Sequence, residues 1–301
     1  MAAETVAPSP LAAILRHLGS EPSRTWSIVI TVFGDAVAPR GGTLWLGSLL
    51  GVFAGMGVGG GVVRTAMSRL AADGWLRRRR VGRNSFYGLT DKGRADFARA
   101  AGRIYGTPPA DWDGRFQIVL PGDDAGRDAA QDALGRSGFG SVAPGVWLAP
   151  AATPLPPEAA PWPRLHACAD PHTGRRLAER AWSLHATAAG YRRFLDAFAP
   201  LRERVAAGEP LSDLDALVAR ILLVHQYRRV VLRDPLLPPA LLPDAWPGTD
   251  ARRLCAEIYR ALLPGSERWL DRHGRGEDGP LPPPRASLWH RFGPDPARPG
   301  A

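Results

Sequence analysis

Hydrophobic residues recur with the period of an α-helix in three early segments, at about 24–37, 44–54 and 60–73. In the third segment, one face is apolar and the opposite face is polar. The apolar face holds Val62, Val63, Ala66, Met67 and Leu70, within an arc of about 140° at roughly 100° per residue. The opposite face holds Arg64, Thr65, Ser68 and Ala72. The pattern predicts an amphipathic helix whose exposed side is small, polar and singly charged.

After this helix, the pattern changes to that of a β-hairpin. Its predicted arms are Leu76–Arg80 and Ser85–Leu89, with Val81–Asn84 as the turn. Thr90 is suited to cap a helix that reaches about Tyr105, because a threonine hydroxyl can accept a hydrogen bond from the first helical turn. Three helices followed by a hairpin predict a winged helix-turn-helix.

The remaining two thirds divide into a mixed middle segment and a helical end. Strands are predicted at 116–120, 146–148 and 165–169, with a helix at 126–137 and a proline-rich loop at 149–163. Helices are predicted at 174–187, 190–206, 212–233 and 250–262. After residue 274 the chain is rich in Gly and Pro, and we expect it to be ordered only by docking.

Composition is that of a globular protein. The chain has 301 residues, of which 45% are hydrophobic, so it can bury a core. Its two cysteines exclude a disulfide framework, and the N-terminus has no secretion signal. Residues 41–63 carry no charge and could span a bilayer, but nine of them are glycine, and two short packed helices explain them better. We expect a soluble, cytoplasmic protein.

The net charge of +9 is concentrated in the first third of the chain. Residues 1–105 hold 14 basic and 6 acidic residues, whereas residues 106–301 hold 24 and 23. A local excess of this kind is typical of a module that binds a polyanion. Genome composition is the alternative, because Arg replaces Lys almost everywhere, but it does not explain why the excess is local.

Four consecutive arginines, residues 77–80, lead into the turn of the predicted hairpin. Small side chains let a helix enter the major groove of DNA, and arginines can reach base edges or phosphates. An ordinary amphipathic helix and a solvated run of charge are the alternatives. The candidate DNA-contacting residues are Arg40, Arg64, Thr65, Ser68, Arg69, Arg78, Arg80, Arg83 and Asn84.

Several motifs resemble those of the PaaX family, the repressors of phenylacetic acid degradation operons. Early motifs are Arg40–Leu49 (RGGTLWLGSL), Gly74–Leu76 (GWL) and Gly82–Tyr87 (GRNSFY). Late motifs are His225–Pro238 (HQYRRVVLRDPLLP), Leu241–Pro243 (LLP) and Ala251–Cys255 (ARRLC). The resemblance covers about residues 20–292 in the right order, and the His225–Pro238 block is very specific.

The resemblance implies an α+β multidomain fold. Its parts are a flexible leader (1–22), a winged-helix DNA-binding domain (23–106), a ferredoxin-like, Cas2-like middle domain (107–172), a helical C-terminal domain (173–292) and a tail (293–301). It also implies a homodimer that binds a palindromic operator and releases it on binding phenylacetyl-coenzyme A. A repressor that senses another acyl- or aryl-coenzyme A is the first alternative, and an interaction scaffold is another. We expect no enzyme activity, cofactor, metal or membrane partner.

A receptor for such a thioester needs arginines for the phosphates and an apolar pocket for the acyl group. Positions 225, 228, 229 and 232 share one face of the helix predicted at 212–233. The candidate effector-binding residues are His225, Tyr227, Arg228, Arg229, Arg233 and Trp246. Alternatively, Arg228 and Arg229 pair with acids such as Asp234 or Glu257 and only hold the domain together.

A Cas2-like domain also raises the lower alternative of a metal-dependent nuclease, which needs an aspartate at the end of the first strand. Here Val119 to Gly122 stand at that place, and Asp123 and Asp124 come later. His166, Cys168 and His172 offer three possible soft-metal ligands without a fourth nearby, so a strand end with a buried cysteine is the favoured interpretation.

Overall fold

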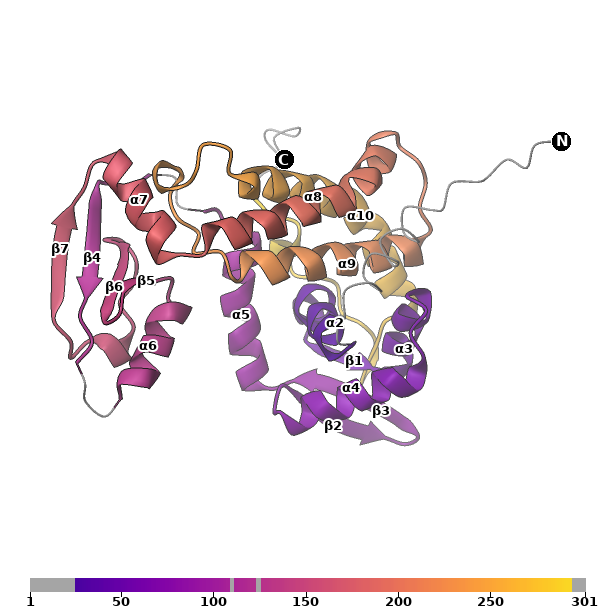
Figure 1. Cartoon of the computed structure of the whole chain (residues 1–301). Coiled ribbons are helices and arrows are strands. Elements are labelled where there is room, and N and C mark those ends of the chain that lie inside the picture. Colours follow the sequence, from indigo (N-terminus) through magenta and orange to yellow (C-terminus); the bar gives the residue numbers. More distant parts are fainter. Residues whose placement is uncertain (1–24, 109–110, 123–125, 294–301) are drawn as a thin grey trace. The chain divides into compact units, whose positions relative to one another are not determined.

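The computed structural model describes residues 25–108, 111–122 and 126–293 (Figure 1). Contacts within the chain divide it into two units. The first comprises Met1–Gly106, Arg192–Arg229 and Thr249–Ala301, and the second comprises Thr107–Tyr191 and Val230–Gly248. The segment 173–292, predicted as one helical domain, therefore contributes to both units. The predicted leader lies outside the described residues.

The front of the first unit combines short helices with a three-stranded antiparallel sheet. In chain order it contains α2 (Thr25–Thr31), a π-helical turn (Val32–Val37), a 3-10 turn (Ala38–Arg40), β1 (Thr43–Trp45), α3 (Leu46–Gly55), α4 (Gly60–Ala72), β2 (Leu76–Val81), β3 (Asn84–Leu89) and α5 (Asp91–Tyr105). The strand order is β1-β3-β2. Thr90 caps α5 as predicted, since its hydroxyl accepts a hydrogen bond from the Gly93 N–H at 3.0 Å.

The segment predicted as a helix from residue 44 begins instead with strand β1. Its three residues pair with β3, and Thr43 lies opposite Gly88. A Cβ at position 88 would lie 2.9 Å from the Thr43 hydroxyl oxygen, so glycine permits the close approach of these strands. The tertiary pairing therefore overrides the local helical pattern at this point.

The apolar face of α4 is narrower than the sequence predicts. Val63, Ala66, Met67 and Leu70 are buried, whereas Val62 is 55% exposed. Val62 lies at one edge of the predicted arc, and the core covers the rest of that arc as far as Met67 at the other edge. The assignment of Val62 to the core was therefore wrong.

Helices from the second half of the chain complete the first unit. They come from α8 (Leu184–Ala206), α9 (Asp213–Val231) and α10 (Pro247–His273), followed by β8 (Arg275–Gly276), β9 (Gly279–Pro280) and a 3-10 turn (Ala286–Leu288). The predicted end of the last helix at 262 is too early, because α10 continues through Pro264. Buried Leu263 and Leu270 on either side of the proline hold the helix in place despite the lost hydrogen bond. The Gly- and Pro-rich segment after 274 is also packed, with Leu281, Leu288 and Phe292 buried.

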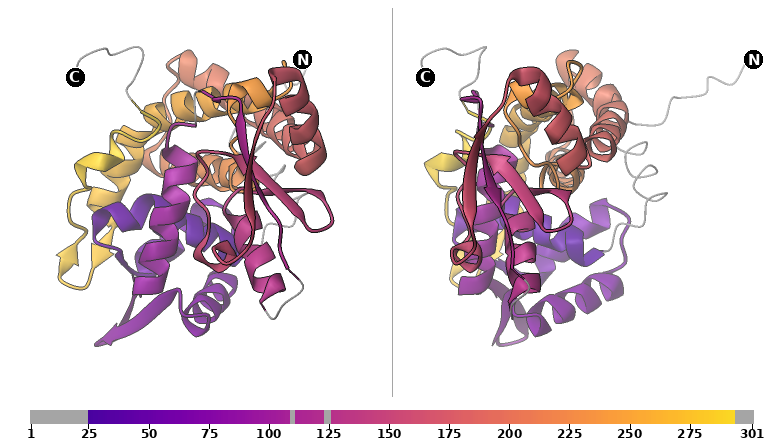
Figure 2. Two further views of the ribbon diagram at one scale, coloured as in Figure 1. Left: turned by 90° about the vertical axis from the view of Figure 1, so that its left-hand side faces the viewer. Right: turned by 60° about the vertical axis from the view of Figure 1, so that its left-hand side comes forward.

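The second unit is built on a four-stranded antiparallel sheet of order β5-β6-β4-β7, which Figure 2 shows from two further sides. Its elements are β4 (Arg115–Val119), α6 (Arg127–Arg136), β5 (Gly140–Ala143), β6 (Val146–Pro150), a 3-10 turn (Pro157–Ala159), β7 (Arg164–Cys168) and α7 (Pro171–Ala181). The sequence did not indicate β5, because residues such as Gly140 and Ser141 have low strand propensity.

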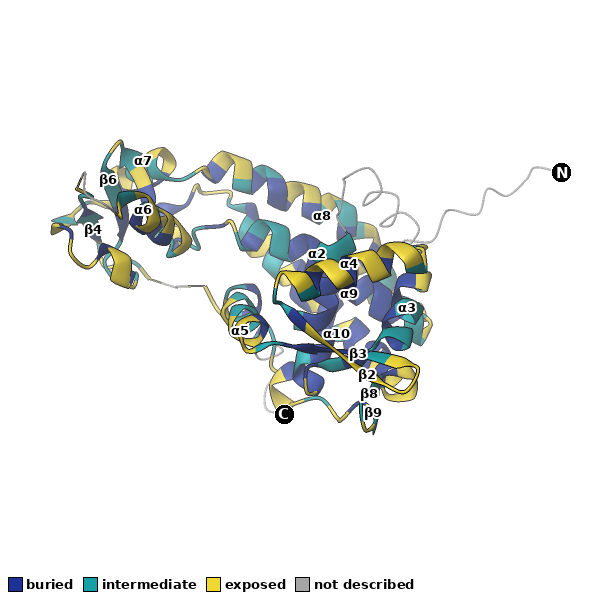
Figure 3. Ribbon diagram, turned by 90° about the horizontal axis from the view of Figure 1, so that it is seen from below, coloured by how far each residue is buried: buried dark blue, intermediate teal, exposed yellow. Residues whose placement is uncertain are grey.

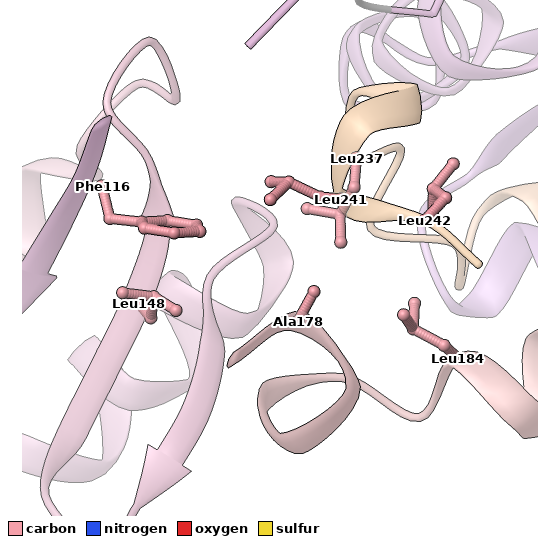
Figure 4. Packing of buried hydrophobic residues seen from close by; sticks show 7 residues of the cluster. All are labelled: Phe116, Leu148, Ala178, Leu184, Leu237, Leu241 and Leu242. Carbon is pink, nitrogen blue, oxygen red and sulfur yellow. The ribbon is translucent and has the colours of Figure 1, made fainter. Parts of the chain in front are cut away.

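Alternate residues of β4 and β6 enter two separate cores, as the strand period of two requires. One core contains Phe116, Leu148, Ala178, Leu184, Leu237, Leu241 and Leu242 (Figure 4). The other contains Val119, Ala130, Leu134, Phe139, Ala149, Ala159 and Trp162. The sheet is therefore covered on both faces.

The boundary between α7 and α8 also differs from the prediction, which placed the break before residue 190. The break lies at Trp182 and Ser183, and Gly190 is inside α8. A Cβ at position 190 would lie 3.2 Å from a methyl group of Val230. Gly190 thus serves a close contact between α8 and α9 rather than the end of a helix.

Within the described residues, no helix is both long enough and apolar enough to cross a membrane. The uncharged stretch 41–63 forms β1, α3 and the start of α4.

Candidate nucleic-acid interface

The face of α4 that points away from the core is polar and open. Arg64, Thr65, Ser68 and Arg69 are all exposed there. Arg69 lies 3.7 Å from the Asp73 carboxylate and stacks over the ring of Trp26 at 5.6 Å. No acidic residue stands in the first turn of α4, so the partial positive charge of its N-terminus is not offset locally.

The hairpin presents its arginines to solvent along the whole of β2. Residues 77–80 are exposed, and so are Arg83 and Asn84 at the turn. The Arg78 guanidinium donates to the Ser85 hydroxyl at 2.9 Å, and Arg80 Nε donates to the Gly82 carbonyl at 3.1 Å. The turn is tighter than predicted: Val81 pairs with Asn84, and Gly82 has a left-handed φ of 59°. Two of the four arginines of β2, Arg78 and Arg80, are thus hydrogen-bonded within the hairpin itself.

The α4 face and the hairpin lie on the same side of the first unit, where α4 contacts β2 (Figure 3). Residues 59–89 hold seven arginines and one aspartate, so the field of this surface is strongly positive. Arg79 is neutralised by Glu277 at 2.5 Å. Among the described residues, Arg64 and Arg83 have no carboxylate within ion-pairing distance. The structure thus brings together eight of the nine predicted DNA-contacting residues.

Arg40 is the exception, because its side chain is completely buried. Its Nε donates to Glu267 at 2.8 Å, and its Nη2 donates to Asp271 at 2.8 Å. Its Nη1 donates to the Pro282 carbonyl at 3.1 Å. All three partners come from the last part of the chain, which the sequence could not place beside it. In this structure Arg40 is an internal ion-pair partner and not part of the exposed surface.

Arg40 belongs to a buried polar cluster centred on Asp35 of the π-helical turn. Arg220 Nε lies 2.7 Å from Asp35 Oδ2 without the alignment of a hydrogen bond, and Arg220 Nη1 donates to Glu267 at 2.6 Å. Asp35 Oδ1 accepts hydrogen bonds from Arg291 at 2.6 Å, Tyr105 at 2.6 Å and Tyr259 at 3.1 Å. The cluster ties α2 and its π-helical continuation to α5, α9, α10 and the segment around Arg291.

Neighbouring charges keep the Asp35 carboxyl group ionised. Burial by itself raises the pKa of Asp35, but Arg220, Arg291 and the two tyrosine hydroxyls outweigh it, so the pKa lies below its ordinary value. Burial raises the pKa of Tyr105 and of Tyr259, so both hydroxyls remain donors. The sequence carried one signal of this cluster: Asp35 and Arg220 are single charges inside apolar runs, and such charges are buried only when paired.

The predicted effector-binding residues fall into two groups. His225, Tyr227, Arg228 and Arg229 lie on α9 in the first unit, whereas Arg233 and Trp246 belong to the second unit. Trp246 packs against the core of that unit and lies 6.0 Å from the ring of Tyr191. Arg233 is exposed.

The members on α9 are held mainly by neighbours from α2 and α8. His225 is buried with its Nδ1 3.1 Å from the Thr31 hydroxyl, and burial followed by the charges of Arg228 and Arg229 lowers the pKa of His225 to about 3. Tyr227 is buried 5.5 Å from the ring of Phe194. Arg228 donates to the Ser27 carbonyl at 2.9 Å.

The residues considered for metal chemistry are not assembled into a site. His166, Cys168 and His172 are all exposed, so the expectation of a buried cysteine at this strand end was wrong. Within the described ranges, no group of three or more His, Cys, Asp or Glu side chains is arranged to hold a metal ion. Asp123 and Asp124 lie outside those ranges.

Comparison with known proteins gives consistent matches along the chain. Residues 24–93 match the model of the PaaX-like protein family, and residues 182–272 match the model of the PaaX-like protein C-terminal domain. The transcriptional repressor PaaX of Escherichia coli (strain K12) is 34% identical over 302 residues, which covers 95% of each chain. Among solved structures, the uncharacterized protein Rv0674 from Mycobacterium tuberculosis has a TM-score of 0.52 and 24% identity, and the match covers 88% of this chain and 98% of that one. The similarity to the Rv0674 structure shows a shared fold.

Proposed function

Since the chain belongs to the PaaX-like family, we propose that it is a transcriptional repressor that binds double-stranded operator DNA. The main structural support for DNA binding is the exposed basic face formed by α4 and the β2–β3 hairpin. A curated relative, 34% identical over nearly the whole chain, is a transcriptional repressor, which supports the same role here.

In this proposal the front of the first unit is a winged helix-turn-helix in which α3 and α4 are the paired helices and the hairpin is the wing. The order of helices and strands and the sheet order β1-β3-β2 support this assignment. Arg64, Thr65 and Ser68 of α4 enter the major groove, and Arg83 at the tip of the wing contacts phosphates or the minor groove.

The second unit corresponds to the ferredoxin-like, Cas2-like middle domain in the same proposal. The order β5-β6-β4-β7 and the helix between β4 and β5 support it. A 3-10 turn stands between β6 and β7, where that fold has a second helix. No described carboxylate stands at the end of β4, so the described part of this unit offers no support for the nuclease alternative.

We further propose that the protein acts as a homodimer and that phenylacetyl-coenzyme A releases it from DNA. A dimer would bind two half-sites separated by about one helical turn of DNA or a multiple of it. A repressor that responds to another acyl- or aryl-coenzyme A is the alternative, and the same assay separates the two.

The test is a gel shift with DNA from upstream of the protein's own gene and of its neighbours, with and without phenylacetyl-coenzyme A. Acetyl- and benzoyl-coenzyme A are tested in parallel, to identify which thioester releases the protein from DNA. We expect a specific complex that phenylacetyl-coenzyme A dissolves. Absence of a specific complex would contradict the repressor, and cleavage of plasmid DNA with Mg²⁺ or Mn²⁺ would favour the nuclease.

Variants locate the interface. Arg64→Ala and Arg83→Ala should each weaken operator binding by at least about 5-fold, and loss of a phosphate contact should reduce the salt slope by about one. Arg99→Ala on α5 is the matched control, because Arg99 is exposed and its ion-pair partner among the described residues is Asp96 of the same helix, at 3.1 Å. Equal affinities for all three variants would contradict the assigned face.

A further inference from the structure

Val62 is an apolar side chain that lies open to solvent on the basic face of the first unit (Figure 3). It is 55% exposed, and it is one of four large hydrophobic side chains that are exposed among the described residues. Val81 of the hairpin is another, so two of the four belong to the elements assigned to DNA. Single exposed apolar side chains are common on protein surfaces, and exposure alone assigns no role. The place of Val62 on α4 distinguishes it.

Val62 stands in the first turn of α4, as the third residue of the helix. In helix-turn-helix proteins, the N-terminal residues of the recognition helix contact the edges of the bases. Thr65 follows three residues later, and residues at that spacing are neighbours on the surface of a helix. Val62 therefore lies beside Thr65, which the proposed function places in the major groove, and both are exposed.

The residues before Val62 leave its surroundings open. Gly59, Gly60 and Gly61 carry no side chains, and a Cβ at position 59 or 61 would meet no atom within 4 Å. No side chain of this segment therefore stands between the start of α4 and a duplex, and the backbone can approach it closely. Val62 is the first residue of α4 that has a side chain to offer to the bases.

The chemistry of the neighbouring side chains defines what Val62 adds. Arg64 supplies a charged donor, whereas the Thr65 hydroxyl already donates to the Gly61 carbonyl at 3.1 Å. An isopropyl group makes no hydrogen bond, so it can recognise only an apolar group on the edge of a base. In the major groove the C5-methyl group of thymine is such a group, and it separates thymine from the other three bases.

We propose that Val62 is a specificity-determining residue that contacts the 5-methyl group of a thymine in the operator. The proposal rests on the proposed function, because it deepens the DNA recognition assigned to α4. Burial of one methyl-sized group from water contributes roughly fourfold in affinity. The contact is apolar and neutralises no phosphate, so its contribution does not depend on salt, unlike that of a phosphate-bound arginine.

The test replaces the thymines of the operator one at a time by deoxyuridine, which lacks the 5-methyl group and keeps the base pair. The full-length wild type, Val62→Ala and Val81→Ala are titrated against each duplex at several salt concentrations. We expect the wild type to lose roughly fourfold in affinity at one thymine of a half-site. V62A should bind the unmodified operator at least about fourfold more weakly and lose nothing further at that thymine.

V81A is the matched control, because it removes the same two methyl groups from another exposed valine of the first unit. It should keep the sensitivity of the wild type to the replaced thymine. Equal sensitivity of V62A and the wild type at that thymine overturns the proposal, and so does loss of the sensitivity in V81A.

The salt dependence separates a direct contact from a structural role of Val62. If Val62 only supported the position of α4, V62A would also displace Arg64 and reduce the salt slope by about one. A direct contact with a methyl group leaves the slope of V62A equal to that of the wild type. A reduced slope therefore overturns the proposal.

The replacement of thymines in the wild-type complex needs no variant, so a folding defect cannot conceal its result. A specific complex that tolerates deoxyuridine at every thymine overturns the methyl contact and leaves the repressor standing. Failure of the proposed function looks different, because the wild type would then form no specific complex with any fragment, and both proposals would fall. If V62A lowers the melting temperature, Val62→Ser takes its place, and the same outcomes apply to it.

Discussion

Replacement of Asp35 by Asn tests how the buried cluster holds the first unit together. Asp35 neutralises Arg220, whose side chain is completely buried, and Arg291, which is 11% exposed. An amide at position 35 can still accept hydrogen bonds from Tyr105 and Tyr259, so the substitution removes mainly the charge. Without it, Arg291 would lose the carboxylate with which it pairs, and Arg220 would keep only Glu267, which it shares with Arg40.

Loss of one partner from a buried ion pair costs about 3–5 kcal/mol, because the remaining charge is left without compensation. We therefore expect D35N to lower the free energy of unfolding by about that amount, measured by urea unfolding with circular dichroism. Asp96→Asn is the control: it breaks the exposed pair with Arg99, which should be worth about 1 kcal/mol or less. Removal of both charges in Asp35→Asn with Arg220→Met should recover part of the loss.

The pH dependence gives a second check on the same residue. The folded pKa of Asp35 lies below its ordinary value, so its stabilising charge is fully present above the unfolded pKa, about 3.9. The contribution is lost as the pH falls from there through the folded pKa. The difference between wild type and D35N should thus be constant above about pH 4 and shrink below it. A D35N protein as stable as D96N, or a difference unchanged in strong acid, would refute the role assigned to the cluster.

Two further predictions concern buried titratable groups. Burial raises the pKa of the Cys255 thiol, whereas Cys168 is exposed. A thiol reagent should therefore label Cys168 alone in the native protein and both cysteines after unfolding. Rapid labelling of Cys255 in the native protein would contradict its burial. His225 has a folded pKa of about 3, below its unfolded value of about 6.5, so the wild type should lose stability as the pH falls below 6.5. The His225→Asn variant lacks this titrating group and should lose less stability between about pH 6.5 and 4. His185→Asn, a change at an exposed position, should behave as the wild type.

Local patterns in the sequence determined much of the proposed DNA-binding face. The helical period predicted α4 to within a residue at its end, and the hairpin arms followed from alternation and from the turn around Gly82. These signals are reliable because the residues that form a helix or a hairpin are neighbours in the chain, so their spacing alone decides which side chains share a face. The exposed arginines of the hairpin follow directly from that geometry.

The interior charges were decided only by the tertiary structure. Arg40 opens an early motif, and local spacing gave no reason to separate it from the DNA-contacting set. Its partner Glu267 is 227 residues away, and Arg220 meets the Asp35 backbone across 185 residues. A guanidinium is stable away from water only beside such partners, and the fold alone determines which of them meet. The same reason explains the exposed Val62 and the packed C-terminal segment, since a core is defined by what covers a face and not by the face itself.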